Sequence, residues 1–250
     1  MSMTNILTSI KNIQEARLIQ DMSVGIVDVK NVDDGALGFV GVEEAEKIFN
    51  FLKTKTLSIT MGDFLNPTEQ KCISNAVLMN KIGFDFIKLG LFSNTSIKHH
   101  KKFLKITNFK KTKPVCVLFA DKTFNFENLE KIIEIGYEAV MIDTLSKSNK
   151  TTNILDYNKL KRFVEFCKDN EIICGISGSV KISDLVNLVQ IQPDFIGLRG
   201  ELCVPKLGRD KLDVKQVSNV LDEFNYALNK SNNGRTLSKV SLYSNSTSES

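Results

Sequence analysis

Short runs of apolar and β-branched residues recur along the chain, and most are followed by a more polar segment with helical periodicity. Each run is long enough for one strand and too short for a buried helix. The pattern therefore predicts eight strands, over Asn5–Ile10, Ile26–Lys30, Leu57–Asp63, Phe86–Leu91, Pro114–Asp121, Ala139–Thr144, Ile172–Ser179 and Phe195–Gly200.

The segments between the strands place apolar residues three and four positions apart, which is typical of helices with one buried face. Leu129, Ile132 and Ile133 follow this spacing. The pattern predicts helices over Val42–Lys53, Glu69–Lys81, Glu127–Ile135, Tyr157–Asn170 and Ile182–Val189, with Val214–Asn229 as the closing helix.

Strict alternation of strands and helices requires a parallel sheet with right-handed crossovers. Eight such units favour closure into a (β/α)8 TIM barrel over an open sheet. No GxGxxG motif follows the first strands, which disfavours a dinucleotide-binding fold. We expect a single barrel domain over residues 1–230 and a disordered Ser- and Asn-rich tail over residues 231–250.

The composition agrees with a globular protein, since 42% of the 250 residues are hydrophobic and 25% are charged. No apolar run reaches the roughly 18–20 residues of a membrane span. The first residues lack the pattern of a signal peptide. We therefore expect a cytoplasmic protein without a membrane partner.

The five cysteines are scattered without a CxxC pair, and His99 and His100 are the only histidines. We expect reduced thiols and no metal site. The net charge of +4 comes from dispersed lysines without a nucleic-acid-binding motif, so no nucleic-acid partner is expected. The sequence is compatible with a homo-oligomer.

Charged residues interrupt the predicted strands near their carboxyl ends, where the active sites of (β/α)8 barrels lie. Asp28 and Lys30 are two residues apart and therefore share one face of their strand. The other strand ends carry Asp63, Lys88, Asp121, Asp143 and Arg199.

Lysines at such positions indicate carbonyl chemistry, because burial and a nearby cation lower the pKa of a lysine and expose a nucleophilic amine. Lys30 and Lys88 lie on the second and fourth strands, and Lys147 follows Asp143 by four residues. Either Asp28 or Asp143 could orient a lysine or move protons. The pattern does not distinguish nucleophile from base.

A phosphate site is predicted at the ends of the last two strands. Gly178-Ser179 precedes a helix, and Arg199-Gly200 ends the eighth strand. Loops after strands seven and eight often bind phosphate in (β/α)8 barrels. We therefore expect a small phosphorylated substrate.

Several runs together resemble the (5-formylfuran-3-yl)methyl phosphate synthase family, also called 4-(hydroxymethyl)-2-furancarboxaldehyde-phosphate synthase. The resemblance rests on Ile26–Asn31, Thr60–Asp63, Phe86–Leu91, Met141–Thr144, Ser177–Ser179 and Gly197–Gly200. It implies a cofactor-independent lyase of methanofuran biosynthesis that condenses two glyceraldehyde 3-phosphate molecules. It also implies Lys30 as the Schiff-base lysine and Lys88 as the proton acceptor, with Asp28, Asp143 and Lys147 in support.

Two other kinds of protein fit the same residues. Another class I aldolase or a phosphosugar isomerase would also need paired lysines and a phosphate site. A non-catalytic phosphometabolite-binding protein would not need inward lysines. Product analysis and borohydride trapping distinguish these alternatives.

Overall fold

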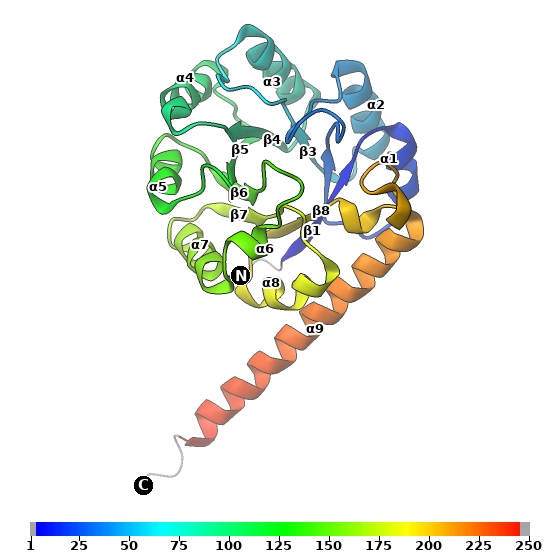
Figure 1. The fold of residues 1–250 in the computed structure, drawn as a ribbon, viewed down its shortest axis with the longest axis vertical. Coiled ribbons are helices and arrows are strands. Elements are labelled where there is room, and N and C mark those ends of the chain that lie inside the picture. Colours follow the sequence, from blue (N-terminus) through cyan, green and yellow to red (C-terminus); the bar gives the residue numbers. More distant parts are fainter. Residues whose placement is uncertain (1–3, 246–250) are drawn as a thin grey trace.

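The computed structural model describes the backbone of residues 4–245 and the side chains of residues 4–232. Its eight strands close into one parallel barrel in chain order, surrounded by helices (Figure 1). The predicted (β/α)8 barrel is thus confirmed. The strands are β1 (Asn5–Ile10), β2 (Ile26–Val29), β3 (Thr56–Thr60), β4 (Phe86–Leu91), β5 (Lys113–Phe119), β6 (Ala139–Asp143), β7 (Ile173–Ile176) and β8 (Phe195–Leu198).

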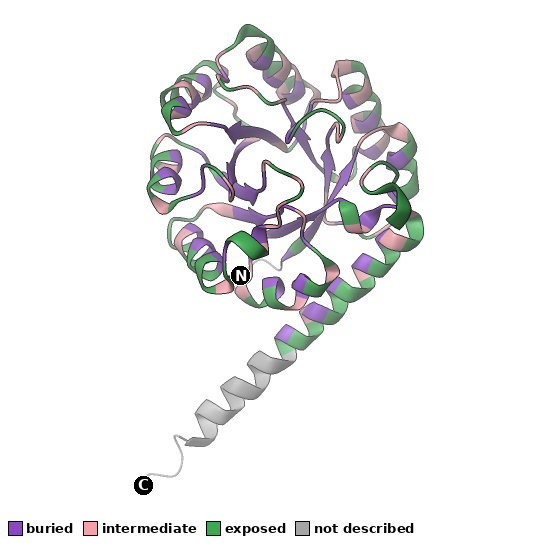
Figure 2. Cartoon of the chain, in the orientation of Figure 1, coloured by how far each residue is buried: buried purple, intermediate pink, exposed green. Residues whose placement is uncertain are grey.

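Helices surround the barrel, and most of them bury one face and expose the other (Figure 2). They are α1 (Ile13–Ile19), α2 (Val42–Leu52), α3 (Gln70–Ile82), α4 (Ile97–Thr107), α5 (Phe126–Glu134), α6 (Thr151–Ile154), α7 (Tyr157–Asp169), α8 (Leu185–Ile191) and α9 (Val214–Asn245). Short 3₁₀ turns occupy Asn94–Ser96, Ile182–Asp184, Gly200–Leu202 and Pro205–Leu207. No described helix has the length and apolar character needed to cross a membrane.

The interior of the barrel is filled by side chains from alternate strand positions, as expected for this fold. Leu7, Val117, Met141 and Phe195 belong to one buried apolar cluster. A Cβ atom on Gly175 would lie only 1.9 Å from the Phe195 ring, so this glycine makes room for the phenylalanine. The packed apolar interior leaves the carboxyl ends of the strands as the place for polar groups.

Helix α1 was not among the helices predicted by range, because its seven residues carry too short an apolar pattern. The start of α1 is nevertheless defined by an N-cap residue. The side chain of Asn12 accepts a hydrogen bond from the backbone N–H of Glu15 at 3.0 Å, which caps the first turn. Helix α1 matters because it carries Glu15 into the barrel mouth.

The closing helix runs past the end of its predicted range, Val214–Asn229. Helix α9 continues through residue 231 to Asn245, whereas residues 246–250 lie outside the described part. Val217, Val220 and Ala227 are buried and anchor the helix. Once its first turns are docked, each further residue adds a backbone hydrogen bond without a new nucleation cost, which favours continuation.

Candidate active site

A cavity of about 620 Å³ opens at the carboxyl ends of the strands. It is lined by residues of β1, β2, β4, β6 and β8 and by the loops after β2, β6, β7 and β8. Nine of the eleven site residues predicted from the sequence line it: Asp28, Lys30, Lys88, Asp143, Lys147, Gly178, Ser179, Arg199 and Gly200. The volume falls in the range of small-molecule sites.

Lys30 directly follows β2 and is 4% exposed. Its backbone N–H donates to the carbonyl of Ile10, which fixes the end of the strand. Its ammonium forms no ion pair with the described residues. Burial lowers the pKa of Lys30 to about 8, with Lys147 acting in the same direction and Asp143 opposing it. A larger fraction of Lys30 is therefore free amine at neutral pH than for an ordinary lysine.

Asp28 and Lys88 form a buried ion pair across the barrel mouth. The Lys88 Nζ lies 2.8 Å from Oδ1 of Asp28, and both side chains are less than 5% exposed. Ser9 lies beside Asp28 in the β1–β2 register and donates its hydroxyl to Oδ2 at 3.3 Å. The pair therefore places a carboxylate and an ammonium side by side at the wall of the cavity.

Asp143 and Lys147 form a second pair, with Lys147 Nζ 3.2 Å from Oδ1 of Asp143. Lys147 also donates to the carbonyl of Thr144 at 2.6 Å, and the Thr144 N–H donates to Asp143 at 2.6 Å. Burial alone would raise the pKa of Asp143, but Lys147, Lys30 and the Thr144 N–H together lower it to about 2. Asp143 is thus a fixed negative charge beside Lys30.

The turn after β7 lines the cavity with Gly178 and Ser179. Gly178 and Ser179 have successive φ angles of 92° and 53°, so the backbone turns sharply at the wall of the cavity. A Cβ atom on Gly178 would lie 2.3 Å from the hydroxyl of Thr151, so glycine is required there. Thr151 in turn donates to the carbonyl of Ser177 at 2.6 Å and holds the turn in place.

Residues 6–221 match the profile of a family described as 4-HFC-P synthase. The chain belongs to this family. The matched range contains every charged residue described above.

Relatives with known names agree with the 4-HFC-P synthase family. The (5-formylfuran-3-yl)methyl phosphate synthases of Methanosarcina mazei and Methanosarcina acetivorans are each 31% identical over 213 residues, covering 79% of this chain and 90% of theirs. The solved 3-keto-L-gulonate-6-phosphate decarboxylase of Vibrio cholerae has a TM-score of 0.62 and 11% identity, over 92% of this chain and 99% of that one. At that identity the likeness shows the barrel fold alone. The chain is thus an enzyme of a synthase family.

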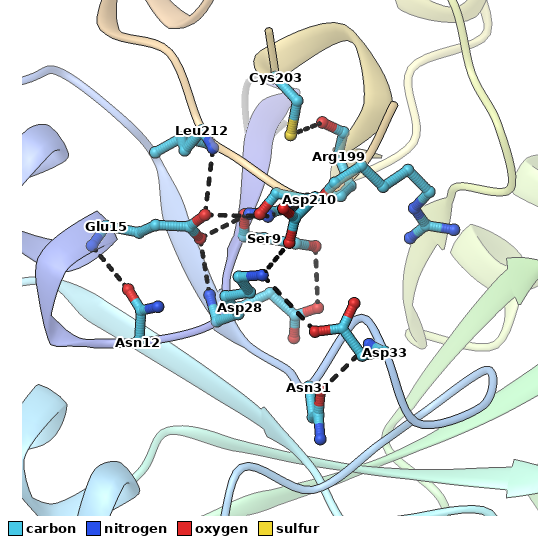
Figure 3. A network of polar contacts seen from close by, with 12 residues as sticks. Ser9, Asn12, Glu15, Asp28, Asn31, Asp33, Arg199, Cys203, Asp210 and Leu212 are labelled. Atoms are coloured by element: carbon cyan, nitrogen blue, oxygen red, sulfur yellow. Dashed lines mark hydrogen bonds and ion pairs between the residues drawn. The ribbon is translucent and has the colours of Figure 1, made fainter. Parts of the chain in front are cut away.

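The prediction that Arg199 binds the substrate phosphate needs correction. Its guanidinium forms a two-point ion pair with Glu15 of α1, at 2.6 and 2.9 Å (Figure 3). Its remaining N–H groups donate to the backbone carbonyls of Ser9, Arg209 and Asp210. All five donors are used by the protein, which leaves none for a phosphate. The sequence could not show this because Glu15 is 184 positions away.

We expect Arg199→Ala to destabilise the fold of this 4-HFC-P synthase family member. The substitution leaves the Glu15 carboxylate buried without its cation, which typically costs about 3–5 kcal/mol. Urea unfolding measures this cost as a lower midpoint. Glu15→Gln should lower the midpoint as well, because it leaves the buried Arg199 cation unpaired and turns an NH2 group toward the N–H of Lys11 or Leu212. An unchanged midpoint in Arg199→Ala would contradict the structural role.

Asp63 and Asp121 lie outside the cavity lining and stabilise neighbouring loops. Asp63 accepts from the backbone N–H groups of Ala36 and Leu37 at 2.8 and 2.7 Å, fixing the loop after β2. Asp121 accepts from the N–H groups of Leu145 and Ser146, fixing the loop after β6. These two predicted candidates therefore support the loops that carry the site.

Sequence reasoning missed Ser9 and Arg209, which also line the cavity. Ser9 ends β1 and could have been found by extending the strand-end argument to uncharged residues. Arg209 lies in the loop between β8 and α9, where no strand or helix pattern assigns it a direction. Residues 4–232 contain no cluster of three or more His, Cys, Asp or Glu side chains suited to a metal ion.

Proposed function

We propose that this protein condenses two molecules of glyceraldehyde 3-phosphate into (5-formylfuran-3-yl)methyl phosphate through an imine on Lys30. One phosphate and two waters leave, and the product serves methanofuran biosynthesis. The observation that carries this proposal is Lys30 itself: a buried lysine without an ion pair among the described residues, with a pKa of about 8, facing a cavity of about 620 Å³.

The first covalent step joins Nζ of Lys30 to the aldehyde carbon and releases water. The protonated imine withdraws electrons from the neighbouring carbon, whose C–H bond then breaks more easily. The electron pair from that bond forms an enamine. When the imine re-forms, the carbon–oxygen bond to phosphate breaks, and phosphate leaves with the bonding pair.

The buried Asp28–Lys88 pair supplies proton transfer in this scheme. An ammonium cannot accept a proton, so Lys88 must first pass one to Asp28, 2.8 Å away. Neutral Lys88 then removes the proton from the carbon beside the imine. Asp143 stabilises the positive charge of the protonated imine, because its low pKa of about 2 keeps it ionised.

The scheme uses the turn at Gly178 and Ser179, together with Gly200, to bind one substrate phosphate through backbone N–H groups. It uses no metal ion or organic cofactor. The substrate class is therefore a small phosphorylated aldehyde.

Product analysis tests the proposal. Incubation with glyceraldehyde 3-phosphate should give a furan aldehyde that absorbs in the near ultraviolet and one phosphate for every two substrate molecules. Lys30→Ala is the matched control, since it reports spontaneous phosphate loss. A sugar phosphate formed without phosphate release would indicate an aldolase, and unchanged substrate would indicate a binding protein. Either result would reject the proposal.

A further inference from the structure

Arg209 is a cation in the cavity that has no role in the proposed reaction. It lines the pocket from the loop between β8 and α9. Its Nε atom is buried, and no hydrogen-bond acceptor lies within reach of it among the described residues. A buried donor without a partner costs free energy, which a bound ligand can recover. Burial also lowers the pKa of Arg209, against the attraction of Asp143.

The charge balance of the cavity singles out Arg209. Seven cationic side chains line the cavity, and within the described part of the chain five of them pair with carboxylates. Three of these pairs are described above, and the other two are Lys150–Asp184 and Lys181–Glu201, both at 2.8 Å. The two cations left are Lys30 and Arg209. Since Lys30 is assigned to the imine, Arg209 is the cation available for an anion.

The backbone of Arg209 is held firmly while its side chain is left free. Arg199 donates from Nε and Nη2 to the carbonyl oxygen of Arg209, at 2.9 and 2.7 Å. Arg199 also donates to the carbonyl of Asp210 at 3.2 Å. Arg199 is itself fixed by Glu15. The buried ion pair thus anchors the loop that carries Arg209.

We propose that Arg209 binds a substrate phosphate and that Arg199 is the residue that positions it. A planar guanidinium matches the geometry of phosphate oxygens and can form two parallel hydrogen bonds with them. The condensation needs two phosphate positions, one for each substrate molecule. The proposed function assigns one to the turn at Gly178 and Ser179, and Arg209 supplies the other. The identity of the phosphorylated substrate rests on the proposed function, whereas the binding of phosphate by Arg209 does not.

Calorimetry with inorganic phosphate on the full chain tests Arg209 without any turnover. Arg209→Gln should weaken phosphate binding by about ten- to a hundredfold, the usual effect of losing a charge-assisted contact. The phosphate affinity of Arg209→Lys should lie between those of Arg209→Gln and the unchanged protein. Lysine keeps the positive charge but cannot form two parallel hydrogen bonds with phosphate. Arg17→Gln makes the same chemical change on the exposed face of α1 and should have no effect. Unchanged phosphate affinity in folded Arg209→Gln would overturn the assignment.

The positioning role of Arg199 is tested by comparing Arg199→Lys alone with the double variant that also carries Arg209→Gln. Arg199→Lys can keep the charge opposite Glu15 but cannot make all of the hydrogen bonds to the loop carbonyls. It should weaken phosphate binding in the otherwise unchanged protein and have little further effect once Arg209→Gln is present. An equal loss in both backgrounds would show that Arg199 does not act through Arg209.

Borohydride trapping separates failure of this inference from failure of the proposed function. Arg209→Gln removes a cation that helps to lower the pKa of Lys30, so some loss of trapping is expected with any aldehyde. Glyceraldehyde lacks the phosphate and measures this loss alone. With subsaturating glyceraldehyde 3-phosphate, the variant should lose more trapping than it does with glyceraldehyde. An equal loss with both aldehydes would count against Arg209. If neither aldehyde is trapped by the unchanged protein, the imine proposal fails, while the phosphate calorimetry still decides the role of Arg209.

Discussion

Replacing Lys30 by Ala or Arg should abolish borohydride trapping of glyceraldehyde 3-phosphate and lower turnover by roughly 10⁴-fold or more. Alanine removes the nucleophile, and a guanidinium stays protonated at neutral pH. Peptide mapping of the unchanged protein should place the reduced adduct on Lys30. Lys150→Ala is a useful control, because this lysine also lines the cavity but is paired with Asp184 at 2.8 Å. A label on Lys88 or Lys147 instead would reverse the assigned roles.

The same lysine predicts a pH dependence of trapping. The pKa of Lys30 is about 8, so the free amine should rise about tenfold between pH 7 and pH 9 and the trapping rate with it. An ordinary lysine would gain reactivity up to about pH 10.5. Lys147→Gln should move the midpoint upward, because it removes a cation that disfavours the ammonium and leaves Asp143 unpaired. A midpoint near 10.5 in the unchanged protein would contradict the assignment.

Strand positions could be predicted from the sequence because barrel strands are buried on both faces and form short apolar runs. Strand β4 matches its predicted range, Phe86–Leu91. Strand β7 was predicted to continue to Ser179 but ends at Ile176. The difference arises because Gly178 and Ser179 adopt positive φ angles that leave the strand ladder, and local composition does not reveal that turn.

The candidate site residues could be placed for a related reason. Once the barrel is inferred, the period of two along each strand puts Asp28 and Lys30 on one face, and closure brings Lys88 and Asp143 to the same mouth. What the sequence could not supply is the partner of each charge. Arg199 ends a strand like the other candidates, but the fold places Glu15 of α1 against it.

Lys88→Ala should still permit imine formation while turnover falls by about 10²–10⁴-fold, the usual contribution of a positioned general base. Lys88→Arg should not restore turnover, because its guanidinium cannot accept a proton at neutral pH. If Lys88 serves only as a cation, the arginine variant should recover much of the activity. Trapping and turnover are measured on the same preparations of both variants.

Because Lys88 is buried against Asp28, its loss has a second consequence that must be separated from catalysis. Lys88→Ala leaves a carboxylate that is only 4% exposed without its cation, at a typical cost of about 3–5 kcal/mol. The double variant Asp28→Asn with Lys88→Met removes both charges at similar volume and should recover part of the lost stability. Its turnover should stay low, since neither proton-transfer group remains. Recovery of turnover together with stability would show that the pair is structural, and an active Lys88→Arg enzyme would rule out Lys88 as the base.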